Sequence, residues 1–412
     1  MAESLFPVRV HQNAPGHWAI RALWAIGAIA FLLYIPMKSE TGTVINMTLA
    51  LQLAVAALAL NLVMGFGGII SIGHSAFFGL GGYTTAVLVD HYDWSQGWTI
   101  YVAVVLGFVV GCVTSLPALR LKGVYLALVT LGLAVLFPQL VKWKKAAWLT
   151  DGARGITKIG YDDIPSWRIF GLDIWPTMKI GPWTIVDEMK RGDGRAVFMW
   201  WVSAIVLVFA YLACRGVIKS RVGRSLIAIR DNETAAAVMG VDLARTKTLV
   251  FGLSAAMCAA AGSLFAVSST NVSPDLPKFT LVGSVTFLLI MVFGGAATLW
   301  GPIIGAIAYV WIETRTRDQG ADALNFGPVH LGSWLLGWMS SSQASLILAA
   351  VLLAMMYLAP FGLIGLFKRG AARVLVIIPA PAGTGSNLPT IEEPIAPSTD
   401  EAFVPTITGE SP

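Results

Sequence analysis

Residues 44–64 have the sequence VINMTLALQLAVAALALNLVM, in which no side chain is charged. A helix of about 20 mostly apolar residues is long enough to cross a hydrocarbon layer roughly 30 Å thick. Four more charge-free runs of this kind follow along the chain, and they are residues 100–119, 123–141, 196–214 and 248–271. Because uninterrupted apolar runs of this length are typical of membrane spans, five of them predict an all-α, polytopic bundle of transmembrane helices.

The composition agrees with a membrane protein and argues against several kinds of site. Of the 412 residues, 56% are hydrophobic and 12% are charged, against roughly 25% charged in soluble domains. The formal charge of +5 is modest and uneven along the loops, which favours a membrane topology signal over nucleic-acid binding. The three cysteines show no CxxC spacing, so no metal site, disulfide framework or cofactor is expected.

Glycine interrupts a sixth apolar region. Residues 281–312 carry no charge, and as one helix they would be about 48 Å long at 1.5 Å per residue. Gly294-Gly295 and Gly301-Pro302 supply a break, so this run is counted as two spans and the hydropathy predicts about ten in total. Gly301 with Gly305, like Gly107 with Gly111, has the spacing that lets membrane helices approach closely, and packing is the preferred interpretation of both pairs.

A second glycine-rich segment, residues 65–83, has the sequence GFGGIISIGHSAFFGLGGY. A bilayer tolerates irregular backbone only where protein or a water-filled cavity satisfies its amides, and paired breaks of this kind point to a transport path. The candidate path residues are Gly68, Ser71, Gly73, His74, Gly294 and Gly295. His74 is either a pore or gate residue, a polar anchor of a broken helix, or a neutral core histidine with its hydrogen bonds satisfied.

Basic residues in short loops predict the orientation, because Lys and Arg accumulate on the cytoplasmic side. They occur at Arg120 and Lys122, within residues 215–247, and at Lys368, Arg369 and Arg373. The expected organisation is a cytoplasmic N-terminus (1–20), a transmembrane domain (21–367) and a cytoplasmic tail (374–412), with residues 142–195 as a long external loop. The tail is rich in Pro, Thr, Ser and Glu and is expected to be disordered.

Catalytic motifs are missing from the sequence. It contains no G-x-x-x-x-G-K-[ST] phosphate loop, no H-E-x-x-H and no G-x-S-x-G, so the chain is not expected to hydrolyse ATP or to be an enzyme. Ion-coupled carriers keep charged residues within their spans, and the five runs have none. Energy from a partner protein is therefore favoured, and an ion-coupled carrier or channel is the remote alternative.

The loop at residues 215–247 has the sequence RGVIKSRVGRSLIAIRDNETAAAVMGVDLARTK. Residues 233–239 are expected to form one short helix, with Asp231 or Asn232 as its N-cap and Gly240 as its C-terminal stop. A helix this short is unstable alone and suits docking into a groove on a cytoplasmic partner. An ordinary charged connector is the alternative.

From this loop onward, SRVGRSLIAIRDNETAAAVMGVDLARTKTLVFGLSAAMCAAAGSLFA (residues 220–266) resembles the membrane subunits of branched-chain amino acid ABC importers, in particular the M-type of the two paired subunits. In ABC importers this loop carries an E-A-A-x-x-x-G pattern that engages a cleft in the ATPase. Ala235, Ala236 and Gly240 match it, whereas Thr234 stands at the glutamate position and Glu233 precedes it. The resemblance implies an ATPase-coupling site at Arg230, Glu233, Thr234, Ala235, Ala236 and Gly240.

Four further stretches resemble the same family: GFGGIISIGHSAFFGLGGYTTAVL, RLKGVYLALVTLGLA, WLTDGARGIT and FGGAATLWGPIIGAIAY. In the third, Asp151 replaces the first glycine of the pattern L-T-G-G-x-x-G-I-T. Together the matching stretches cover residues 44–366.

The resemblance implies an importer of leucine, isoleucine and valine in the bacterial plasma (inner) membrane. The expected partners are a homologous second permease subunit, two cytoplasmic ABC ATPases and an extracytoplasmic substrate-binding protein. An importer of urea or short-chain amides is the alternative within the family, because these systems look alike in the membrane and the binding protein largely selects the substrate.

Overall fold

The computed structural model describes residues 39–120, 124–157, 159 and 191–319. It also describes short pieces at residues 8–11, 27, 35–36, 168–169, 172–173, 179–180, 183–184, 325–326, 329–330, 362–365 and 375–378. Most of residues 12–38, 160–190 and 320–374 and most of the predicted tail lie outside the described residues.

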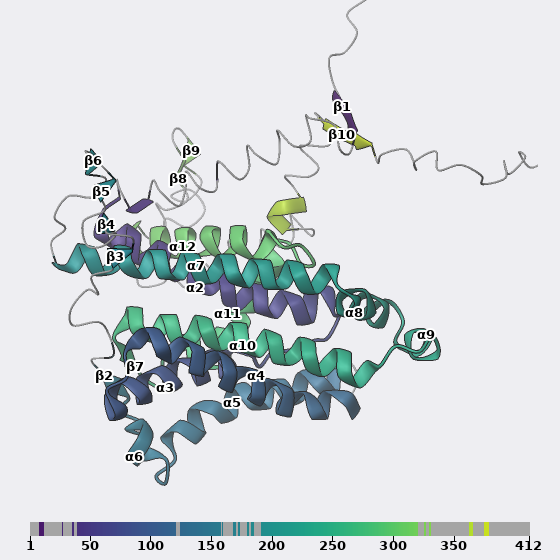
Figure 1. The fold of residues 1–412 in the computed structure, drawn as a ribbon, viewed down its shortest axis with the longest axis horizontal. Coiled ribbons are helices and arrows are strands. Elements are labelled where there is room, and N and C mark those ends of the chain that lie inside the picture. The colour runs from purple at the N-terminus through teal and green to yellow at the C-terminus, as the bar shows by residue number, and fades with distance from the viewer. Residues whose placement is uncertain are drawn as a thin grey trace, which may run out of the picture.

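The described elements are mainly long helices that lie side by side in one bundle (Figure 1). The long helices are α2 (Thr41–Asn61), α3 (His74–Tyr92), α4 (Gln96–Arg120), α5 (Val124–Lys142), α7 (Arg191–Lys219), α10 (Leu243–Ser269), α11 (Leu281–Gly294) and α12 (Gly301–Gln319). The short ones are η1 (Leu62–Phe66, a π-helical turn), α6 (Ala147–Thr150), α8 (Arg221–Asp231), α9 (Glu233–Val238) and η2 (Pro277–Phe279).

Strands are short and pair only two by two in the described part of the chain. The strands are β1 (Val8–His11), β2 (Ile156–Thr157), β3 (Arg168–Ile169), β4 (Leu172–Asp173), β5 (Lys179–Ile180), β6 (Trp183–Thr184), β7 (Asn271–Val272), β8 (Asn325–Phe326), β9 (Val329–His330) and β10 (Leu375–Ile378). β1 pairs in parallel with β10, so a segment of the N-terminal region lies beside the start of the predicted tail. The other four pairs are antiparallel.

Five of the described helices are long and apolar enough to cross a membrane: Thr41–Phe66, Gln96–Leu116, Tyr125–Lys142, Gly194–Lys219 and Leu243–Ser269. They coincide with the five charge-free runs, so the prediction of a polytopic helical membrane protein is confirmed. α7 and α10 extend beyond their runs into residues 215–247. The count of about ten spans stays a prediction.

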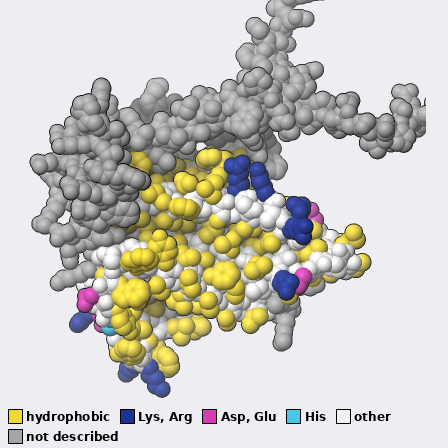
Figure 2. Space-filling view, viewed as in Figure 1, with side chains coloured by type: hydrophobic (Ala, Val, Ile, Leu, Met, Phe, Trp, Pro, Cys, Tyr) yellow, Lys and Arg dark blue, Asp and Glu magenta, His cyan; other side chains and the backbone are white. Residues whose placement is uncertain are grey.

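α10 is the central helix of the bundle. It packs against α2, α3 and α4, and α2 in turn packs against α7 and α12. α4 and α5 instead present large apolar side chains outward, among them Tyr101, Val109 and Leu128. Figure 2 shows hydrophobic side chains over the middle of the visible face, with Lys, Arg, Asp and Glu gathered toward the two ends of the helices, as expected because charged side chains are costly within a bilayer.

Both glycine-rich interruptions break helices where the sequence predicted. α2 ends in η1, the chain is irregular from residue 67 to residue 73, and α3 then begins at His74. α11 ends at Gly294 and α12 begins at Gly301, so these two helices form a hairpin. The glycines thus mark two places where the backbone leaves the helical ladder inside the apolar bundle.

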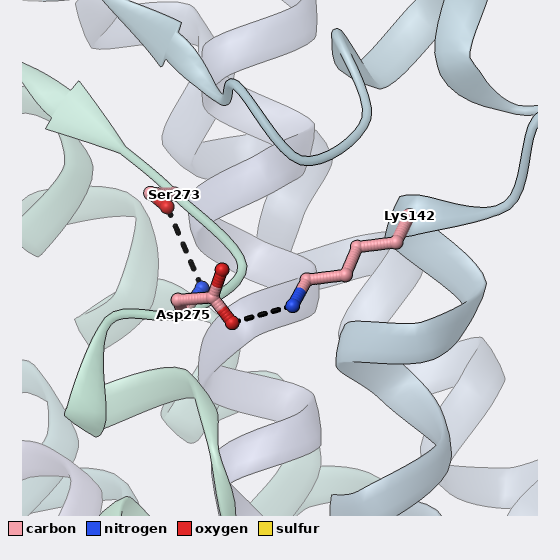
Figure 3. Close-up of polar contacts among 3 residues, drawn as sticks. All are labelled: Lys142, Ser273 and Asp275. Carbon is pink, nitrogen blue, oxygen red and sulfur yellow. Dashed lines mark hydrogen bonds and ion pairs between the residues drawn. The ribbon is translucent and has the colours of Figure 1, made fainter.

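The two ends of the bundle differ in what they carry. At one end β2 pairs with β7, and Lys142 of α5 forms an ion pair with Asp275, whose backbone N–H donates to Ser273 Oγ at 3.4 Å (Figure 3). His91 Nε2 also lies 3.1 Å from the carbonyl oxygen of Trp148 there. The opposite end carries α8 and α9 (Figure 1).

Candidate functional site

α8 is an amphipathic helix that the sequence analysis did not predict. Ser220 caps its start by accepting a hydrogen bond from Gly223 N at 3.4 Å. Gly223, Leu226 and Ile229 are buried at a spacing of three residues, so this face packs against the bundle and the other faces water.

α9 forms where the sequence predicted a short helix. Of the two N-cap candidates the structure uses Asn232, whose Oδ1 accepts from Ala235 N at 3.0 Å, whereas Asp231 pairs with Arg230 at 3.1 Å. At the other end Gly240 has φ +82° and donates to Ala237 O, while Val241 N donates to Ala236 O, both at 3.0 Å. This is a Schellman motif, which needs the left-handed conformation that glycine adopts most easily.

The tip of α9 is apolar and exposed. Ala236 is buried, but Val238 and Met239 are each 83% exposed at the end of the molecule that carries the short helices. Thr234 and Ala235 are exposed beside them. Glu233 points the other way and accepts a hydrogen bond from Lys247 Nζ of α10 at 2.7 Å. The predicted coupling residues therefore form one projection, although Glu233 is engaged within the chain.

His74 lies at the start of α3 and is buried. Its Nε2 is 2.8 Å from Ser254 Oγ, and its Nδ1 is 3.0 Å from Ser71 Oγ. Ser254 donates its only proton to Ala59 O at 2.6 Å, so Nε2 must donate to Ser254 and Nδ1 accepts from Ser71. Both ring nitrogens have a hydrogen-bond partner in this tautomer, which supports the anchoring and core-histidine interpretations. The hydrogen bonds of His74 and Ser254 together connect α2, α3 and α10.

The six candidate path residues fall in three places. Ser71, Gly73 and His74 lie together, and a Cβ at Gly73 would meet Thr130 O at 2.3 Å. Gly68 has φ +65° and lies beside the Arg230 side chain, next to the coupling projection. Gly294 and Gly295 lie at the α11–α12 hairpin, where a Cβ at Gly294 would meet Gly301 O at 1.8 Å. Gly73 and Gly294 permit close backbone approach, and the place of the six residues on a transport path stays a prediction.

Asn61 joins the two glycine breaks, and the sequence analysis missed it. At the end of α2, its Nδ2 donates to Thr298 O at 2.8 Å and its Oδ1 accepts from Ala297 N at 2.9 Å. Both partners lie in the turn between α11 and α12, and a Cβ at Gly65 would meet Ala297 N at 2.7 Å. The available signal was an asparagine inside an apolar run directly before a glycine-rich segment, because such a side chain in a membrane span needs partners.

Replacing Asn61 with leucine should lower the stability of the protein markedly. The change leaves the N–H of Ala297 and the carbonyl of Thr298, two half-buried residues, without their side-chain partner. A fully buried group left unpaired costs about 1–3 kcal/mol, which is the upper range for each of these. Thermal unfolding of the detergent-solubilised protein measures the effect. Asn46→Leu is the matched control, because Asn46 is a half-buried asparagine of the same helix with no side-chain hydrogen bond to a described residue. Equal melting temperatures for the two variants would contradict the role of the Asn61 side chain in joining α2 to the turn between α11 and α12.

No group of three or more His, Cys, Asp or Glu that could hold a metal occurs among the described residues. The free cysteines Cys112, Cys214 and Cys258 lie on three different helices.

A family profile described as "Branched-chain amino acid transport system / permease component" matches residues 42–356. The chain belongs to this family of permease components. It is therefore a multi-pass membrane subunit of a branched-chain amino acid ABC transport family and not an enzyme. The resemblance drawn from the coupling loop and the glycine-rich segments is confirmed.

This permease component is similar to the high-affinity branched-chain amino acid transport system permease protein LivM of two bacteria. It is 30% identical to the Escherichia coli protein over 301 residues, which is 72% of this chain and 68% of LivM. It is 30% identical to the Salmonella typhimurium protein over 288 residues, or 69% of this chain and 65% of that protein, so it spans about two thirds of these relatives. LivH of Escherichia coli is 22% identical over 300 residues, 68% of this chain and 89% of LivH. No solved structure matches the chain.

Proposed function

We propose that the permease component carries leucine, isoleucine and valine into the cytoplasm, driven by ATP hydrolysis in a separate subunit. The observation that carries this proposal is the α8–α9 projection at one end of an apolar helix bundle. Its helices are capped by Ser220, Asn232 and Gly240, and its tip exposes Val238 and Met239. Exposed apolar side chains on a rigid, capped element are suited to a cleft on a partner protein.

We place the α8–α9 end in the cytoplasm. Arg221, Arg224 and Arg230 lie on α8, in agreement with the positive-inside rule. The end with the Lys142–Asp275 pair then faces outward, where residues 142–195 form the external loop. The transmembrane domain at residues 21–367 has about ten spans, and residues 1–20 and 374–412 lie on the cytoplasmic side.

The expected complex contains this subunit, a homologous second permease subunit, two ABC ATPases and an extracytoplasmic binding protein. The similarity to both LivM and LivH supports a pair of related permease subunits. The coupling residues at the ATPase are Arg230, Thr234, Ala235, Ala236 and Gly240, with Glu233 oriented toward α10.

The transport path would pass the two glycine breaks. In the present conformation Asn61 closes one against the other, and His74 holds the start of α3 against α10. Opening the path would require these close approaches to separate, and discrete hydrogen bonds of this kind can be exchanged between two packed states. The residues involved remain Gly68, Ser71, Gly73, His74, Gly294 and Gly295, to which Asn61 is added.

Deleting the chain should abolish ATP-dependent uptake of branched-chain amino acids. Uptake of radiolabelled leucine and of urea is compared in cells with and without this subunit. We expect leucine uptake to fall to background and urea uptake to be unchanged. Loss of urea uptake alone would assign the subunit to the amide importers, and uptake that survives ATPase loss but collapses with the ion gradient would identify a secondary carrier.

A further inference from the structure

Lys247 is the one Lys, Arg, Asp or Glu residue that is buried in the part of the chain that the structure describes, with 7% of its surface exposed. It lies in the second turn of α10, where that helix enters the bundle. A buried ammonium group is costly unless an opposite charge accompanies it. Its position therefore requires a fixed partner.

That partner comes from the coupling helix. Glu233, the first residue of α9, holds Lys247 Nζ at 2.7 Å, and its own side chain is 26% exposed. The other ion pairs between described side chains, such as Arg245 with Asp242 and Lys142 with Asp275, are far more exposed, and exposed pairs contribute little. The Glu233–Lys247 pair is thus the one partly desolvated charge contact between α9 and a membrane helix in the described residues.

α10 connects this pair to the glycine-broken core. Ser254 follows Lys247 by seven residues, which is about two helical turns and returns to nearly the same face. Ser254 bonds both Ala59 of α2 and His74 of α3. A displacement of α9 that is transmitted through Lys247 would therefore move the helix that holds the start of α3.

We propose that Glu233 and Lys247 are positioning residues that fix the coupling helix to α10, so that ATPase motion reaches the membrane core through this ion pair. Glu233 then uses its Oε1 within the chain, although it stands next to the position where related importers carry a glutamate. The proposal rests on the proposed function of the α8–α9 projection as the ATPase docking site.

The test uses the complete transporter in proteoliposomes, with its ATPases and binding protein. Glu233→Gln, Lys247→Met and the charge swap Glu233→Lys with Lys247→Glu are compared for ATPase association and for leucine carried per ATP hydrolysed. We expect normal association, a roughly tenfold lower transport ratio in each single variant, in the range of measured coupling effects, and recovery to within about threefold in the swap. Lys142→Met, which removes an exposed lysine ion pair at the opposite end, is the matched control and should keep the ratio.

Three results would overturn the proposal. They are an unchanged transport ratio in the single variants, a swap that stays as impaired as they are, and weakened ATPase association in Glu233→Gln alone, which would place the carboxylate at the ATPase. If Lys247→Met fails to reach the membrane, the transport ratios of Glu233→Gln and of the charge swap test the proposal. A docking variant, Met239→Asp, is measured in parallel. Normal ATPase association and uptake in that variant would refute the α8–α9 docking surface itself. A defect in Met239→Asp together with normal transport in the Glu233 and Lys247 variants would refute only the proposed role of the ion pair.

Discussion

Replacing Gly111 with leucine should sharply reduce the amount of correctly folded permease in the membrane. Gly111 faces α10 from α4, and a Cβ there would lie 2.4 Å from Ala255 Cβ, 3.0 Å from Gly252 Cα and 3.2 Å from Phe251 O. Two of these atoms belong to the α10 backbone, which cannot move aside as a flexible side chain would. Overpacking of this kind costs about 1–3 kcal/mol and more where backbone must move, a large share of a typical stability of about 5–15 kcal/mol.

The measurement is the amount of monodisperse protein in detergent after membrane extraction. Gly132→Leu is the matched control, because Gly132 is an exposed glycine in the middle of α5 with no atom within 4 Å of its Cβ position. We expect the control to extract like the wild type. Equal yields of the two variants would show that α4 and α10 do not approach each other as closely as the structure indicates.

Gly107 and Gly111 illustrate how much of the helix packing the sequence could predict. Their spacing predicted a close helix contact, and both do face α10, where Ala255 and Ala259 are small enough to admit them. The spacing alone did not identify α10 as the partner helix. Lipid and protein interiors are equally apolar, so no hydrophobic periodicity distinguishes the lipid-facing side of a membrane helix from its protein-facing side. α2 and α4 have similar apolar sequences, yet α2 is enclosed and α4 is largely exposed.

The helix breaks and the α9 helix were predictable because their causes are local. Gly294-Gly295 ends α11, and Asn232 and Gly240 bound α9 through contacts within a few residues. Contacts between distant segments were not predictable. Asn61 forms a hydrogen bond with a residue 237 positions further along the chain. Lys247 of α10 contacts the carboxylate of Glu233, which lies 14 residues earlier at the start of α9.

Changing Met239 to aspartate should strongly reduce ATPase association and leucine uptake. The side chain of Met239 packs little against the rest of the chain, since the residue is 83% exposed, so the variant should insert and extract normally. Burying a methionine side chain at an interface is worth about 1.5–3 kcal/mol, and desolvating a carboxylate in its place adds a penalty. Together they amount to a loss of about 3 kcal/mol or more, which is over a hundredfold in affinity.

Co-purification of the ATPases and leucine uptake in proteoliposomes measure this loss. Met239→Leu is the matched control, because it keeps an apolar side chain of similar volume and should retain both activities. If Met239 is an apolar anchor at the interface, the two variants should differ in affinity for the ATPase by about a hundredfold or more. If the aspartate variant assembles and transports like the leucine variant, α9 is an ordinary connector, and the ATPase must engage another part of the molecule.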